Sequence, residues 1–219
     1  MRTSNIKLVV IFTLFIGLNS LLAQNKKTIQ LYKIQKSKAV NRTLKTIDSK
    51  NIKYLNISEN KKEGLVWLDT KEFKNGSIEI KMRGKDELQK SFIGIAFHAQ
   101  NDSVYDAVYC RPFNFVTKDS VRRIHSIQYV SHPKFTWKKL RDEKNAQFEK
   151  EINNPPDPND WFIMRLYVKD NKIEAFINDS NKPSLIVNKL SNNNKGKIGL
   201  FVADSSGGDF QSVKIYFEK

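Results

Sequence analysis

Cysteine is almost absent from this chain: Cys110 is the only one in 219 residues. A single cysteine excludes a disulfide within the chain, although oxidising compartments favour disulfides in small secreted domains. Cys110 follows the apolar run Ala-Val-Tyr, and the sequence around it supplies no base that would activate a thiol. We therefore expect Cys110 to pack as a small buried hydrophobic residue.

Histidine is also scarce, and metal-binding motifs are lacking. The three histidines, His98, His125 and His132, do not follow the spacing of a zinc site. Asp204 and Asp209 flank a Ser-Gly loop whose oxygens could help to hold a structural calcium ion, although a plain Gly-rich hairpin explains the same residues. We expect no catalytic metal and no organic cofactor.

Long apolar runs are missing beyond the N-terminus. Arg2 and Lys7 precede an apolar run over residues 8–18, and Ala23 offers a small residue for cleavage. This layout is typical of a secretory signal peptide, and the run is shorter than the roughly 20 residues of a membrane span. We expect residues 1–23 to be removed and residues 24–219 to form one exported domain, periplasmic or extracellular, without stable membrane insertion. An uncleaved N-terminal anchor is the alternative.

Acidic residues are in deficit: 38 Lys and Arg stand against 23 Asp and Glu, a formal net charge of +15. Such a balance raises the question of nucleic acid. The excess is mostly lysine spread along the chain, and an exported protein rarely meets nucleic acid, so we expect no such partner. A solvated basic surface explains most of the charge, and attraction to an acidic polysaccharide is the remaining interpretation.

Long amphipathic helices and internal repeats are absent as well, whereas strand-like alternation is frequent. Ile78, Ile80 and Met82, for example, alternate with charged residues over 77–83. About ten to twelve such runs, separated by Asn, Gly and Asp turns, predict an all-β antiparallel sandwich of the jelly-roll type. A long, partly helical loop is expected over 132–151, and loops of this length tend to be functional.

The middle of the chain is the most informative part. Three predicted strands, over 91–100, 104–111 and 122–130, send apolar side chains to one face and polar or aromatic ones to the other. An outer face of this kind predicts a binding surface or the floor of an active site, to which the 132–151 loop adds a wall. The candidate ligand-binding residues are His98, Tyr109, Arg111, Gln128, Trp137 and Arg141.

Arg111 and Tyr109 form the leading pair, because a guanidinium fork suits sugar hydroxyls or a carboxylate and a tyrosine ring offers an apolar plane. Each candidate also has a structural interpretation. His98 and Gln128 fit hydrogen-bonded buried positions, and Trp137 fits a cap on the core. Burial and mutual pairing of Arg111 and Gln128 would mark the site built on them as scaffold and withdraw the function assigned to it.

Residues 73–217 resemble the concanavalin A-like lectin/glucanase superfamily, closest to exported bacterial laminin-G-like or DUF1080-like (3-keto-disaccharide hydrolase-like) domains. The resemblance covers about two thirds of the chain and implies two curved sheets. The segments that carry it are Phe-Lys-Asn-Gly-Ser-Ile-Glu-Ile (73–80), Ser-Phe-Ile-Gly-Ile-Ala-Phe-His (91–98), Tyr-Asp-Ala-Val-Tyr-Cys-Arg-Pro-Phe-Asn-Phe (105–115), Ile-Gln-Tyr-Val-Ser-His-Pro (127–133), Asp-Trp-Phe (160–162), Lys-Ile-Gly-Leu-Phe-Val (197–202) and Gly-Gly-Asp-Phe (207–210).

Two departures from that superfamily bear on activity. The alternating acids of family-16-type glucanases are replaced over 79–83 by Glu-Ile-Lys-Met-Arg, and the Trp- and Gly-rich opening of the keto-disaccharide hydrolases is absent. Fold alone does not fix function. The leading hypothesis is a carbohydrate-binding, lectin-like module that recognises a glycan, with an acidic polysaccharide as one option, on its concave sheet. A glycoside-cleaving hydrolase or lyase is the alternative, and an envelope protein that binds another protein is the third hypothesis.

Overall fold

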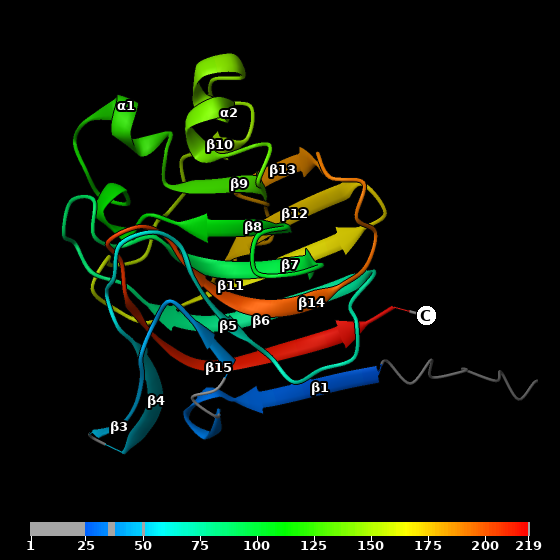
Figure 1. The fold of residues 1–219 in the computed structure, drawn as a ribbon. Helices are drawn as coiled ribbons and strands as arrows, with labels where there is room; N and C mark the ends of the chain where they lie inside the picture. Colours follow the sequence, from blue (N-terminus) through cyan, green and yellow to red (C-terminus); the bar gives the residue numbers. More distant parts are fainter. Residues whose placement is uncertain (1–24, 35–37, 50, 219) are drawn as a thin grey trace, which may run out of the picture.

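The computed structural model describes residues 25–34, 38–49 and 51–218, and in this part of the chain two antiparallel sheets pack face to face (Figure 1). The predicted all-β jelly-roll sandwich is confirmed. Sheet A contains, in spatial order, β13 (Leu185–Asn188), β12 (Lys172–Ile177), β11 (Phe162–Lys169), β6 (Gly76–Arg83), β15 (Gly208–Phe217), β4 (Ile52–Ile57) and β3 (Leu44–Ser49), and β1 (Asn25–Gln30) also pairs with β15.

Sheet B forms the second layer and carries short helices at one end. Its strands are β10 (Glu149–Lys150), β9 (Ile127–His132), β8 (Tyr105–Cys110), β7 (Ile93–Ala99), β14 (Lys197–Val202), β5 (Gly64–Trp67) and β2 (Ala39–Val40). The helical segments are η1 (Leu31–Lys33), η3 (Pro112–Asn114), α1 (Ser120–Arg123) and α2 (Trp137–Glu143). No helix within the described ranges is long and apolar enough to cross a membrane. The predicted signal peptide lies outside these ranges.

The core lies between the two sheets. Ile78, Ile80 and Met82 on β6 are fully buried, whereas the charged residues that alternate with them face outward, as the period of two predicts. Cys110 is buried in the same core, and burial raises the pKa of its thiol. The structure therefore agrees with an inert, packed cysteine.

A bulge in β7 overturns the predicted orientation of His98. Gly199 of β14 pairs with Ala96, but Lys197 pairs with Ala99, so β7 carries one extra residue, and His98 adopts a φ of 50°. The expectation that His98 shares the outer face with Ala96 is wrong. Ala99 takes that face, and His98 turns inward, fully buried, with Nε2 2.7 Å from the Lys74 carbonyl oxygen.

The strand predicted over 122–130 begins later than expected. Asp119 caps α1 by accepting hydrogen bonds from the backbone N–H groups of Val121 and Arg122 at 2.9 and 3.2 Å, so Arg122 is helical. In β9, Ile127 and Tyr129 face the core, while Gln128 and Val130 face outward. The helical segment expected in the 132–151 loop is α2.

The core also contains a polar cluster. Asp106 is fully buried and accepts hydrogen bonds from the Tyr129 hydroxyl at 2.7 Å and the Ser191 hydroxyl at 2.6 Å. Lys189 reaches into the same cluster, 3.5 Å from Nδ1 of His98. These contacts tie the loop after β13 to strands β8 and β9 of the opposite sheet.

Acid should destabilise the fold from about pH 6.5 downward. Burial lowers the pKa of His98, His125 and His132, so the unfolded chain takes up protons near pH 6.5 that the native protein does not. Stability present above that pH is lost as the pH falls through it. Urea unfolding at pH 7.5 and 5.5 measures the difference in the free energy of unfolding. His98→Gln should make this difference smaller. Equal stability at both pH values would contradict the account.

Candidate functional site

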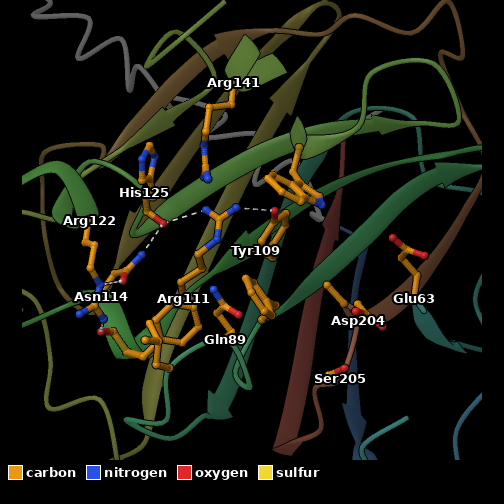
Figure 2. A pocket seen from close by; sticks show the side chains of 15 residues that line it. Glu63, Gln89, Tyr109, Arg111, Asn114, Arg122, His125, Arg141, Asp204 and Ser205 are labelled. Carbon is orange, nitrogen blue, oxygen red and sulfur yellow. Dashed lines mark hydrogen bonds between the residues drawn. The ribbon is translucent and has the colours of Figure 1, made fainter. Parts of the chain in front are cut away.

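A cavity of about 520 Å³ opens on the outer face of sheet B, which we call the outer pocket (Figure 2). Three parts of the fold enclose it: strand β8 below, the segment from η3 to α2 on one side, and the loop around Asp204 on the other. Four of the six predicted binding residues line it, namely Tyr109, Arg111, Trp137 and Arg141. His98 and Gln128 do not.

The floor of the outer pocket is aromatic. Phe92 packs edge-on against Phe113, with ring centroids 5.3 Å apart, and against Tyr109 at 6.2 Å. The Arg111 guanidinium lies 5.4 Å from the Phe92 ring centroid and 4.9 Å from that of Tyr109. Flat apolar rings beside fixed donors are a common arrangement for holding a ring-shaped polar ligand.

Arg111 and Gln128 are buried and bound to each other. Nη2 of Arg111 donates to Oε1 of Gln128 and, at 2.8 Å, to the Tyr109 hydroxyl, which itself donates to Gln128 at 2.8 Å. Nη1 of Arg111 donates to the His125 carbonyl oxygen at 2.8 Å. With 4% and 0% of their surfaces exposed, these two residues support the floor. The prediction that they contact a ligand directly is therefore corrected, and any proposal of glycan binding here has to rest on other residues of the pocket.

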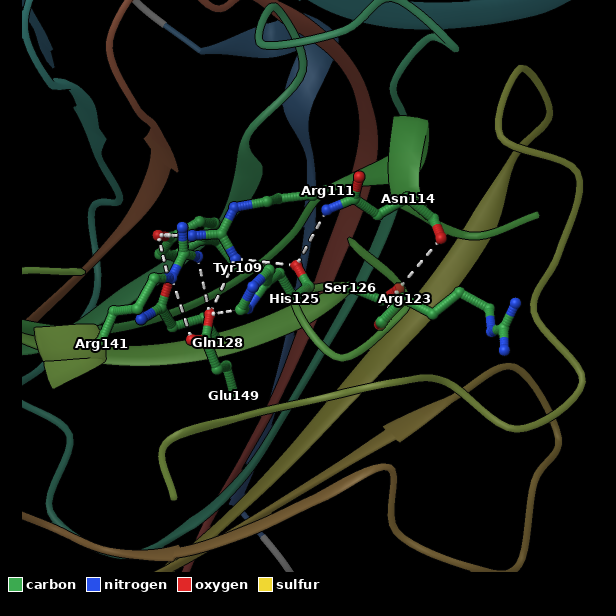
Figure 3. Close-up of polar contacts among 9 residues, drawn as sticks. All are labelled: Tyr109, Arg111, Asn114, Arg123, His125, Ser126, Gln128, Arg141 and Glu149. Atoms are coloured by element: carbon green, nitrogen blue, oxygen red, sulfur yellow. Dashed lines mark hydrogen bonds and ion pairs between the residues drawn. The ribbon is translucent and has the colours of Figure 1, made fainter. Parts of the chain in front are cut away.

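One buried carboxylate organises the basic wall of the pocket (Figure 3). Glu149, on β10, accepts two hydrogen bonds from Arg141, from Nε at 3.1 Å and Nη2 at 2.9 Å. Its Oε2 also lies 2.8 Å from Nδ1 of His125 and 3.7 Å from Nη1 of Arg111. A single negative charge is thus shared by two guanidinium groups and an imidazole.

His125 is held as a neutral imidazole at neutral pH. Burial lowers its pKa, and the cations Arg141 and Arg111 lower it further, against the opposing effect of Glu149. Nδ1 lies 2.8 Å from Oε2 of Glu149 but makes no hydrogen bond within the described residues, and Nε2 is the nitrogen left for a ligand. A neutral imidazole beside a carboxylate can accept a proton, as a general base does.

Trp137 and Arg122 complete the basic side. Trp137 begins α2 at the pocket rim, is 45% exposed, and carries the Arg141 guanidinium 5.2 Å from its ring centroid. Arg122 donates from Nε to Oδ1 of Asn114 at 3.2 Å and from Nη2 to the Phe113 carbonyl oxygen at 2.8 Å. Their positions leave an exposed indole and fixed guanidinium groups beside the cavity.

The opposite wall is acidic and comes from Glu63, Asp204 and Ser205. Oδ1 of Asp204 accepts a hydrogen bond from the backbone N–H of Lys62, so the two loops support each other. The sequence suggests Asp209 and Asp204 together as candidate calcium ligands. In the structure the Asp209 carboxylate instead accepts hydrogen bonds from Arg83 and from Asn56, each at 2.7 Å. Its carboxylate is occupied on sheet A.

Several lining residues are not among the six predicted binding residues, notably Arg122, His125, Asn114, Glu63 and Asp204. The helical cap at Asp119 is the signal that could have placed the residues near Arg122 in a loop above the sheet. Glu63 is distant in sequence from β8, and no local pattern connects the two. Only the tertiary structure places Glu63 in the same pocket as β8.

Residues 22–216 match the model of a family described as 3-keto-alpha-glucoside-1,2-lyase-like domains. Among solved structures, carbohydrate-binding module CBM66 from Bacillus subtilis is 14% identical with a TM-score of 0.53, covering 80% of this chain and 96% of that one. The exoplasmic/lumenal domain of VIP36, bound to calcium and Man3GlcNAc, is 10% identical with a TM-score of 0.53, covering 88% of both chains.

A putative glycosyl hydrolase from Parabacteroides distasonis is 13% identical, with a TM-score of 0.50, covering 84% of this chain and 89% of that one. No curated protein matches the sequence. At these identities the structural similarities establish the fold alone.

Proposed function

This chain belongs to the family of 3-keto-alpha-glucoside-1,2-lyase-like domains, and from that premise we propose that it binds a glycan in the outer pocket. The observation that carries the proposal is the convergence of a stacking floor, an exposed indole and fixed polar groups around one open cavity. Sugar rings present apolar C–H faces and a rim of hydroxyl groups, which such a lining can satisfy together. Carbohydrate ligands named for CBM66 and VIP36 agree with this class of partner.

The basic side of the outer pocket favours a glycan that carries an acidic group. Arg111, Arg122 and Arg141 line the basic side, and Glu149 is the carboxylate that neutralises them in part. Guanidinium groups pair well with carboxylates and sulfates. We therefore place an acidic substituent of the sugar near Arg122 and Arg141, and the hydroxyl groups of the ring toward Glu63 and the loop beside it.

Cleavage of a 3-keto glycoside is the second candidate function, and the neutral His125 beside Glu149 in the pocket lining favours it. Nε2 of His125 would take the proton from carbon 2, which the neighbouring ketone makes acidic. The electron pair would form a double bond between carbons 1 and 2, and the glycosidic C–O bond would break, its oxygen gaining a proton from water. Guanidinium groups close by would stabilise the enolate that develops.

Binding is tested by a glycan array followed by calorimetry on the best ligands. Trp137→Ala should weaken binding about tenfold or more, because it removes the exposed stacking surface at the rim. Ile52→Ser, at an exposed position on sheet A, is the matched control and should bind like the wild type. Absence of binding by the wild type to every array member would contradict the proposal.

Catalysis is tested separately, by incubating the protein with a 3-keto glucoside and following the unsaturated product. His125→Gln should abolish turnover while leaving binding within a few-fold of the wild type, because glutamine keeps hydrogen-bonding capacity but cannot act as a base at neutral pH. If the wild type binds the glucoside without turning it over, the carbohydrate-binding function stands and the lyase activity is rejected.

We also propose that the protein is exported, as the N-terminal layout predicts. Expression of the full chain in a bacterial host, followed by fractionation and N-terminal sequencing, should give a mature protein that begins at Gln24. A retained Met1 in the cytoplasmic fraction would contradict export.

A further inference from the structure

We infer a second sugar-binding site on the opposite side of the molecule, in a slot between Tyr167 and Tyr216 on the outer face of sheet A. Three neighbouring strands build it. Tyr167 on β11 lies directly opposite Ser77 on β6, and Ser77 lies directly opposite Tyr216 on β15. Two aromatic rings therefore flank one small residue across three strands, and a separate cavity of about 220 Å³ lies there.

The dimensions of the slot suit a single pyranose ring. Neighbouring strands are about 4.8 Å apart, so the two tyrosines start from backbones roughly 10 Å apart. A ring inserted between them can contact each tyrosine at the usual separation of about 4 Å. Ser77 leaves the middle open, whereas a large side chain at that position would fill it.

Both tyrosines are supported from outside the slot, which reduces the conformational entropy that a ligand must remove. The Lys26 ammonium lies 5.2 Å from the Tyr216 ring centroid, and Lys26 stands on β1, on the far side of β15. Phe176 on β12 meets Tyr167 edge to face at 5.4 Å. Tyr167 nevertheless remains 44% exposed and accessible to a ligand.

The floor of the slot supplies both kinds of hydrogen-bonding group. The Arg165 guanidinium is fixed there, because its Nη2 donates to the carbonyl oxygens of Asn178 and Ser180, each at 2.9 Å. Glu79 beside it pairs through Oε1 with Lys214 at 2.7 Å. A guanidinium and a carboxylate next to each other suit adjacent sugar hydroxyls, which a neutral pyranose offers. We therefore take a neutral pyranose as the ligand of the slot.

The two sites face opposite directions, because the outer pocket opens on sheet B and the slot on sheet A. The inference does not depend on the outer pocket. If both sites bind, one molecule can hold two polysaccharide chains, and avidity for a mixed polymer surface exceeds the affinity of either site alone.

Amide chemical shifts of the isotopically labelled protein, titrated with neutral methyl pyranosides and their disaccharides, test the slot. We expect shifts at Ser77, Tyr167 and Tyr216. Tyr167→Ala should weaken this binding at least tenfold, and Ser77→Leu, which fills the slot, should abolish it. Ile186→Ser, three strands from β6 in the same row, and Trp137→Ala should leave it unchanged.

Shifts confined to the outer pocket, or no shifts with any neutral sugar in the panel, would overturn the inference. Equal binding by Tyr167→Ala and Ile186→Ser would do the same. If neutral sugars still bind at the slot in Trp137→Ala, the second site is supported even when the outer pocket binds nothing. The two proposals can therefore fail separately.

Discussion

Glu149→Gln should lower the free energy of unfolding by about 3–5 kcal/mol, the range for removing one partner from a buried ion pair. The Glu149 side chain is 2% exposed, and its charge is shared by Arg111, Arg141 and His125. Arg111 is itself 5% exposed and would keep a buried positive charge without its carboxylate. Urea unfolding monitored by fluorescence and circular dichroism measures the loss.

Glu151→Gln is the matched control two residues away. Glu151 is paired with Arg123 at 3.6 Å, but both side chains are exposed, so its loss should cost less than about 1 kcal/mol. A double variant, Glu149→Gln with Arg111→Met, should be less destabilised than the sum of the single variants, since no isolated charge then remains in the floor. Equal effects of Glu149→Gln and Glu151→Gln would contradict the role assigned to Glu149.

Arg42→Met should lower the free energy of unfolding by about 2–4 kcal/mol, because several carbonyl groups lose a charged donor at once. Arg42 is 8% exposed and donates to the carbonyl oxygens of Asn41 and Lys62 at 2.7 Å, Ala203 at 3.0 Å and Ser206 at 3.2 Å. Burial lowers its pKa, against the opposing charge of Asp204, which is consistent with its enclosed position.

Arg42 also positions the acidic wall of the outer pocket, since the loops that it joins carry Glu63 and Asp204. Gly64 makes this possible: a Cβ there would lie 2.5 Å from Cγ of Arg42. We expect Arg42→Met to weaken glycan binding as well as the fold, and Arg42→Lys to restore little, because one ammonium cannot reach all four carbonyl groups.

Arg123→Met is the control for this prediction. Arg123 also donates to two loop carbonyl oxygens, those of Thr117 and Lys118 at 3.3 and 3.2 Å, but its side chain is 38% exposed. Its loss should change stability by less than about 1 kcal/mol. If Arg42→Met were no more destabilised than Arg123→Met, the loops around Asp204 would not depend on Arg42.

The sequence predicts the sandwich because strand periodicity is local: Ile78, Ile80 and Met82 lie on the core face as their spacing requires. It fails at His98 for a reason that is not local. One extra residue in β7, relative to β14, reverses the face of every side chain beyond it, and no turn residue marks that bulge. Simple alternation therefore assigned His98 to the wrong side.

The candidate site was predictable only where its residues lie on the same segment of the chain. Tyr109 lies on β8 and Arg111 directly follows that strand, while Trp137 and Arg141 lie one turn apart on α2, so each pair follows from its own segment. Whether Arg111 is free or engaged depends on Gln128, from a neighbouring strand, and on Glu149, from beyond α2. Such partners become visible only when the segments are placed together in space.

The central claim, that the outer pocket holds a glycan, is tested most directly by an experimental structure of the protein with the best array ligand bound. The account predicts a sugar ring against Phe92 and Phe113, with Trp137 at its edge and an acidic substituent near Arg141. A saturating ligand that leaves this cavity empty and binds elsewhere on the molecule would contradict it.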